Sequence, residues 1–161
     1  MNKTKNLTRA AIIAALYVIL TFVSHIFGMA SGAIQLRISE ALTVLPYFTP
    51  VAIPGLTVGC VISNLLMGSN TLDIIFGSLA TFIGALGTYA LRKKSPYFAF
   101  IPPVVANTLI VPCVLIYAGA EGGWWFFALT VFIGEVLSCG ILGTVLVKNL
   151  KSRKYSHFIN K

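Results

Sequence analysis

A carboxyl group interrupts a long apolar stretch near the end of the sequence. Glu135 lies ten residues after Trp125, and the run from Trp124 to Val147 holds no other charged side chain. If the tryptophans mark the membrane surface, a helix places Glu135 about 16 Å deeper, near the middle of a bilayer. An ionisable group at that depth costs about 2.5–3.5 kcal/mol. Glu135 could join two helices in its protonated form, but we favour a contact with a bound ligand.

Five further polar residues lie in or beside apolar runs. Arg37 and Glu40 are three residues apart, so a helix places them on one face, either to bind a ligand or as a surface ion pair. Asp73 begins an apolar segment, where interaction with the helix dipole competes with a binding role. Asn64 and Asn107 each need hydrogen-bond partners, which a ligand or a neighbouring helix could supply.

Familiar catalytic and nucleotide-binding motifs are absent from the sequence. It holds no G-x-x-x-x-G-K-[ST] loop for ATP, no G-x-S-x-G elbow and no H-E-x-x-H pair. Four acidic residues and two histidines are a poor basis for a catalytic triad or a metal site. Cys60, Cys113 and Cys139 lie far apart in apolar runs, so we interpret them as small apolar residues. We therefore expect no enzyme activity, no metal and no cofactor.

The composition indicates a membrane protein. Hydrophobic residues make up 57% of the 161 residues and charged residues 10%, whereas about 25% of a soluble domain is charged. The formal net charge is +8, but the basic residues fall in short clusters between apolar runs, which argues against nucleic-acid binding. The clusters are Lys3, Lys5 and Arg9; Arg92, Lys93 and Lys94; and Lys148, Lys151, Arg153 and Lys154.

Six apolar segments must position the polar residues named above. They predict an all-α integral membrane protein, a bundle of six transmembrane helices that forms a single domain over residues 1–161. The predicted helices cover approximately residues 10–27, 38–48, 51–67, 72–91, 97–118 and 124–148.

The even number of segments agrees with the distribution of charge. Six crossings put all three basic clusters on one side, and the positive-inside rule makes that side the cytoplasm. We therefore expect a bacterial plasma-membrane protein with both termini in the cytoplasm. Segment 38–48 is short, because about 11 helical residues reach only about 16 Å of a core about 30 Å thick. This crossing must therefore be a short one, be extended at one end, or be partly shielded by its neighbours. We expect a cavity near its outer end, where Arg37 and Glu40 lie.

Small residues recur at helical spacing in two of the segments. Ala10/Ala14 and Ala11/Ala15 form a stripe on the first segment, and Gly55/Gly59 form one on the third. Such stripes let helices approach closely. The spacing leaves open whether the partner helix belongs to this chain or to another protein.

Several stretches of the sequence occur in a recognisable combination. The most specific is Arg37-Ile38-Ser39-Glu40-Ala41-Leu42, within the run from Gln35 to Pro46. The others are residues 10–17, 73–81, 103–107 and the pair Gly134-Glu135. Together they resemble the QueT family over nearly the whole chain. That family comprises substrate-binding (S) components of energy-coupling factor (ECF) transporters, which are linked to the uptake of queuosine precursors.

The resemblance implies a six-helix S component that has no ATPase of its own. Such a component associates with a membrane coupling protein and two cytoplasmic ATPases. The implied docking surface is the stripe formed by Ala10, Ala11, Ala14 and Ala15.

The ligand implied by the resemblance is 7-aminomethyl-7-deazaguanine (preQ1). Its guanine-like edge presents adjacent N–H donors that one carboxylate can accept, and its aminomethyl group is a cation. A hypothesis from this chemistry assigns Glu135 to the guanine edge, Asn107 to the carbonyl side and either Glu40 or Asp73 to the ammonium. The expected substrate-binding residues are Glu135, Asn107, Glu40, Arg37, Asp73, Asn64 and, stacked on the base, Tyr117.

Two other functions are open on the sequence alone. A small ion- or proton-coupled secondary transporter of a polar or cationic solute could use Glu135 as a proton relay, and it would need no ATP-driven partner. An assembly or scaffold protein could use the same polar residues only to join helices, and it would bind no small ligand tightly.

Overall fold

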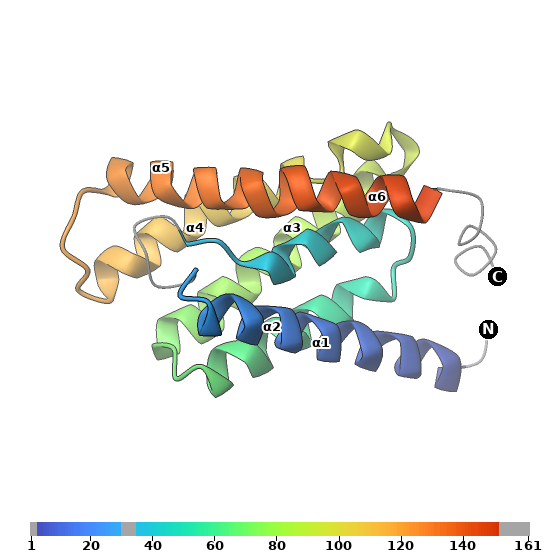
Figure 1. The fold of residues 1–161 in the computed structure, drawn as a ribbon, viewed down its shortest axis with the longest axis horizontal. Coiled ribbons are helices and arrows are strands. Elements are labelled where there is room, and N and C mark those ends of the chain that lie inside the picture. The colour runs from blue at the N-terminus through green and yellow to red at the C-terminus, as the bar shows by residue number, and fades with distance from the viewer. Residues whose placement is uncertain (1–2, 30–34, 152–161) are drawn as a thin grey trace.

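The computed structural model describes residues 3–29 and 35–151, and the regular elements in these ranges are all helical (Figure 1). The elements are α1 (Lys3–Ile26), η1 (Ile38–Tyr47), α2 (Ala52–Leu66), η2 (Asp73–Gly77), α3 (Ser78–Ala90), η3 (Leu91–Lys93), η4 (Pro96–Phe98), α4 (Ile101–Tyr117), α5 (Trp124–Glu135), η5 (Val136–Leu142) and α6 (Gly143–Lys151). Among them η1, η3 and η4 are 3-10 helices, and η2 and η5 are π-helical turns. The predicted all-α fold is confirmed.

The surface of the bundle is apolar and much of its interior is polar. Phe22 on α1 and Leu129 on α5 are 51% and 58% exposed, whereas Thr21 and Ser24 on α1 are buried. This distribution suits a lipid environment, because lipid chains solvate apolar side chains and leave polar groups to find partners inside. Four described stretches are long and apolar enough to cross a membrane: Lys3–Ile26, Asp73–Lys93, Pro96–Tyr117 and Trp124–Lys151. The chain is a multi-pass membrane protein.

The predicted short second segment is the 3-10 helix η1. At about 2.0 Å per residue, its ten residues reach about 20 Å. Residues 35–37 precede it without regular structure, so the chain is non-helical at one end of this segment. Seven of its residues are buried, and it packs against α1, α3, η5 and α6. Burial among other helices makes irregular backbone tolerable at membrane depth.

Two helix boundaries differ from those expected from the apolar runs. The first helix begins at Lys3 instead of near residue 10, because helical hydrogen bonding continues into the polar residues that precede the apolar run. The expected helix at residues 97–118 is divided into η4 and α4. Pro102 and Pro103 lie in the first turn of α4, where prolines are tolerated but where they prevent continuation from the preceding helix.

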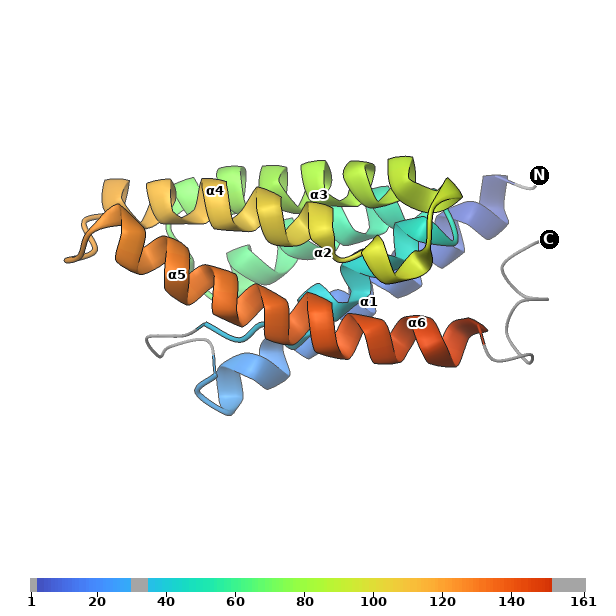
Figure 2. The same cartoon turned by 90° about the horizontal axis from the view of Figure 1, so that it is seen from above.

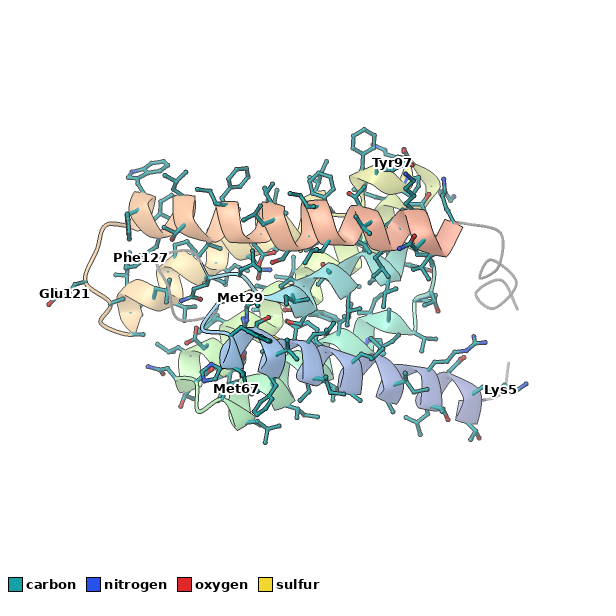
Figure 3. All side chains as sticks on the ribbon, viewed as in Figure 1. Lys5, Met29, Met67, Tyr97, Glu121 and Phe127 are labelled. Carbon is teal, nitrogen blue, oxygen red and sulfur yellow. The ribbon has the colours of Figure 1, made fainter. Side chains whose placement is uncertain are left out.

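Both ends of the described chain lie at one end of the bundle (Figure 1). Lys5 and Tyr97 lie at this end, and Glu121 lies at the opposite end (Figure 3). The basic residues of α1, η3 and α6 are therefore gathered at one end, as six crossings require. Arg153 and Lys154 fall outside the described residues, and the cytoplasmic location of this end stays a prediction.

The small-residue stripes of α1 and α2 pack against each other. A Cβ atom added to Gly55 would lie 2.7 Å from the carbonyl oxygen of Ala10, and one added to Gly59 would lie 3.0 Å from that of Ala14. Ala10 and Ala14 thus serve the internal contact between α1 and α2. Ala11 and Ala15 are exposed on the outer side of α1, so only this half of the expected docking stripe is left for a partner.

Candidate functional site

Two acidic side chains from distant parts of the sequence meet inside the bundle. Glu40 is on η1 and Glu135 ends α5, and one ligand-type atom from each, together with Sγ of Cys139, lies within 4.8 Å of the others. Glu40 is 1% exposed and Glu135 8% exposed. We call Glu40, Glu135 and Cys139 the carboxyl cluster. Like charges this close repel strongly when buried, so the cluster requires protons or cations nearby.

Hydrogen bonds occupy three of the four carboxyl oxygens. Asn107 donates from Nδ2 to Oε1 of Glu135 at 3.0 Å, and Sγ of Cys139 lies 3.1 Å from Oε2 of the same side chain. The hydroxyl of Tyr17 donates to Oε1 of Glu40. The Asn107 amide also lies near the Glu40 carboxyl. Nevertheless, Oε2 of Glu40 is buried without a hydrogen-bond partner among the described residues.

The helices that carry these groups depart from α-helical geometry beside them. Glu40 lies on a 3-10 helix, Glu135 is followed at once by the π-helical turn η5, and Asp73 begins the π-helical turn η2. Side chains also hold the η1 backbone in place, because Thr43 donates to the Glu40 carbonyl at 2.6 Å and Sγ of Cys139 lies 3.2 Å from the same oxygen. Short π and 3-10 segments inside helices often mark functional sites.

A polar cavity of about 200 Å³ is lined by residues of α1, α2, η2 and α4 and by the chain just before η1. Nη2 of Arg37 donates to Oδ1 of Asn64 at 2.5 Å, and Nδ2 of Asn64 donates to the backbone carbonyl of Asp73 at 3.1 Å. This chain of bonds ties the start of η1 to α2 and η2. Met67 also lines the cavity and lies away from the end marked by Lys5 (Figure 3). The full lining is Thr21, His25, Gln35, Arg37, Asn64, Met67, Ser69, Asp73, Gly77, Val111 and Leu115.

The carboxyl cluster lies about one helical turn deeper than this cavity. On α1, Thr21 lines the cavity and Tyr17, four residues earlier, binds Glu40. On α4, Val111 lines the cavity and Asn107, four residues earlier, binds Glu135. Four residues rise about 6 Å in an α-helix. The cavity and the cluster are therefore successive levels of one polar region.

Comparison with known proteins places the chain in a family. Residues 7–152 match the model of the QueT transporter family. This chain belongs to that family. The family predicted from the sequence is thereby confirmed, and a transporter family agrees with the expectation that the chain is not an enzyme.

A curated relative supports the same assignment over part of the chain. The queuosine precursor transporter QueT of Lactococcus lactis subsp. cremoris is 39% identical over 99 residues. The alignment covers 60% of this chain and 58% of that protein. No solved structure matches the chain.

Six of the seven residues expected to bind substrate in this QueT-family chain fall on the two levels of the polar region. Arg37, Asn64 and Asp73 line the cavity, and Glu40, Asn107 and Glu135 lie below it. The alternative of a surface ion pair between Arg37 and Glu40 is wrong, because Glu40 is buried and bonds to Tyr17 while Arg37 bonds to Asn64.

Tyr117 lies apart from these residues. Its side chain is 83% exposed, and it lines a separate apolar cavity of about 480 Å³ together with Leu72, Phe76 and Leu109. The structure therefore does not bring Tyr117 together with the polar cavity.

Sequence reasoning assigns no binding role to three contributors to this candidate site. Tyr17 lies within an apolar run of the sequence, although its phenol is the only hydroxyl-bearing aromatic group in α1 and needs a buried partner. Cys139 was interpreted as a small apolar residue, yet its thiol contacts both acidic residues of the cluster. His25 lines the cavity. One signal in the sequence could have identified Cys139. It lies four residues after Glu135, so a helix places the thiol and the carboxyl group side by side.

Proposed function

We propose that this QueT-family chain captures a queuosine precursor, preQ1, in the polar cavity. The observation that carries the proposal is the lining of that cavity, where Arg37, Asn64 and Asp73 meet inside a bundle whose surface is apolar. The name of the Lactococcus relative supports the choice of ligand class. A volume of about 200 Å³ lies below the roughly 300–1,000 Å³ of pockets for drug-sized ligands, as suits a single small base.

The cavity offers the groups that a guanine-like edge requires. The Asp73 carboxylate can accept the two adjacent N–H donors of the base, and the Arg37 guanidinium can donate to its carbonyl oxygen. Asn64 binds the backbone carbonyl of Asp73, so this bond leaves the carboxylate available. These roles replace the assignment of Glu135 to the guanine edge, because Asp73 lines the polar cavity and Glu135 does not.

Asn64→Leu is expected to weaken preQ1 binding at least about tenfold. The substitution removes both hydrogen bonds that hold Arg37 and the start of η2 in position, and misplaced polar groups lose most of their binding energy. Isothermal titration calorimetry of the purified protein in detergent measures the effect. Asn149→Leu is the matched control, since Asn149 is exposed on α6 at the opposite end of the bundle. If the unsubstituted protein does not bind preQ1, the proposed function is rejected.

The proposal includes an energy source outside this chain. As an ECF S component in a bacterial plasma membrane, the chain would release its ligand on association with a membrane coupling protein and two cytoplasmic ATPases. The basic end of the bundle would face the cytoplasm. The exposed residues Ala11 and Ala15 would meet the coupling protein, because small side chains allow a close helix contact in a membrane.

Ala15→Trp is expected to abolish uptake of preQ1 in cells while the affinity of the purified protein stays within about twofold. The indole would hold the coupling protein away from α1, yet it would not reach the polar cavity. Leu79→Trp serves as control, because Leu79 is a 43% exposed residue of α3. Uptake by the isolated chain in proteoliposomes, driven by a proton gradient without ATP, would contradict the proposal and favour a proton-coupled secondary transporter.

A further inference from the structure

The polar region contains one carboxyl oxygen for which the described residues supply no partner. Glu40 is 1% exposed, and its Oε2 accepts no hydrogen bond from them within bonding geometry, because the nearby Asn107 amide donates to Glu135 instead. A buried acceptor without a donor is destabilising, and more so if it carries charge. The atom belongs to the carboxyl cluster, where acidic groups from η1 and α5 lie within 4.8 Å of each other and of a thiol. Such an arrangement fits a ligand that brings hydrogen-bond donors to this oxygen.

The charges around the cluster indicate what kind of occupant fits. Glu40 and Glu135 would carry two negative charges when ionised, and the Arg37 guanidinium interacts electrostatically with both. The Cys139 thiol of the cluster and the Tyr17 phenol beside it are neutral in their protonated forms, and the Asn107 amide is uncharged. The single positive charge of Arg37, which also interacts with Asp73, balances at most one of these negative charges, so the other must be balanced by a proton on a carboxyl group or by a cation. A monovalent cation balances it, whereas a divalent metal ion would leave an excess positive charge in a buried site.

The position of the cluster indicates where on a ligand that cation must be. The cluster lies about one helical turn, roughly 6 Å, below the cavity that Arg37 and Asp73 line. A base held in the cavity by its guanine edge would therefore need a short, flexible arm that ends in a positive charge. A primary ammonium on one methylene group is such an arm, and it has three donors for carboxylate oxygens.

We propose that the carboxyl cluster is an ammonium subsite that selects ligands with a primary amine over neutral ligands of the same shape. The proposal rests on the proposed function, since the base must occupy the adjacent cavity. Oε2 of Glu40 accepts one N–H of the ammonium and Glu135 supplies the second negative charge. Tyr17, Asn107 and Cys139 hold the two carboxyl groups in place by the bonds described above.

The test compares two ligands that differ only in the arm. Binding of preQ1 and of 7-cyano-7-deazaguanine, in which a neutral nitrile replaces the aminomethyl group, is measured by calorimetry on the purified full chain. The unsubstituted protein is expected to prefer preQ1 by about 30-fold or more, because a buried charged partner is lost with the nitrile. Glu40→Gln and, separately, Glu135→Gln are expected to reduce that preference to within about threefold by weakening preQ1 binding alone.

Two features keep the result interpretable. Retained binding of the neutral analogue shows that each variant is folded. Asp73→Asn is the matched comparison, because it should weaken both ligands alike and leave their ratio unchanged. Equal affinities for the two ligands in the unsubstituted protein, or an unaltered preference in both glutamine variants, overturns the ammonium subsite and leaves the proposed function standing. If neither ligand binds the unsubstituted protein, the proposed function fails and the subsite is rejected with it.

Discussion

Asp73→Asn is expected to weaken preQ1 binding by about 100-fold. Asp73 lines the cavity at the start of η2, and only a carboxylate can accept two adjacent N–H groups of the base at once. The amide keeps the volume of the side chain but replaces one acceptor oxygen by a donor, which then opposes a donor of the ligand. Calorimetric titration of the purified variant with preQ1 measures the loss.

Glu121 provides a control for the removal of an acidic residue at the end of the bundle opposite the termini. Glu121 lies in the exposed loop between α4 and α5, at the end opposite the termini (Figure 3). Glu121→Gln should leave the affinity within about twofold, because an exposed carboxylate contributes little. If both variants bind preQ1 equally well, Asp73 does not contact the base. A comparable loss in both variants would instead indicate a long-range effect of net charge.

Arg37→Gln is expected to lower the free energy of unfolding by at least about 2 kcal/mol, without any ligand present. The guanidinium is the charge opposite the two buried acidic residues, and its bond to Asn64 joins η1 to α2. Its loss leaves Glu40 and Glu135 facing each other without compensation. Thermal unfolding in detergent should show a melting temperature about 5 °C lower, since 1 kcal/mol corresponds to about 2–4 °C for a chain of this size.

A double-mutant cycle separates this charge effect from the loss of the bond to Asn64. Arg37→Gln combined with Glu40→Gln should recover about 1 kcal/mol or more relative to the sum of the two single changes, because the remaining carboxyl group is then no longer paired with another. Arg92→Gln is the control, since Arg92 is exposed and stacks on the Tyr89 ring at 3.9 Å. Additive losses at Arg37 and Glu40 would show that the guanidinium does not act on this acidic group.

The arrangement of the long helices explains how residues distant in sequence reach one place. The helix from Trp124 to Lys151 runs across the bundle (Figure 2), and its middle carries Glu135 and Cys139. A Cβ atom added to Gly134 would clash with the backbone carbonyl of Gln35. The absence of a side chain at Gly134 therefore lets the chain before η1 pass close to α5, which brings Glu40 against Glu135.

The sequence alone was sufficient for the membrane fold and the family, and it singled out most of the polar residues that the candidate site brings together. Charged residues are so few that apolar runs between basic clusters define the segments, and a carboxyl group such as Glu135 within such a run is conspicuous because its insertion is costly. The described basic residues of α1, η3 and α6 lie at one end of the bundle (Figure 1 and Figure 3), as the predicted six segments require, whereas the side of the membrane that this end faces stays a prediction.

The tertiary structure alone decided which residues share a level and what they contact. Spacing along one helix cannot show that Ala10 and Ala14 meet Gly55 and Gly59, nor that Tyr117 points away from the cavity. The pairing of Glu40 with Glu135 depends on the packing of η1 against η5, a contact between segments almost a hundred residues apart. Local patterns report the environment of a side chain, whereas its partners across the bundle depend on how the helices pack.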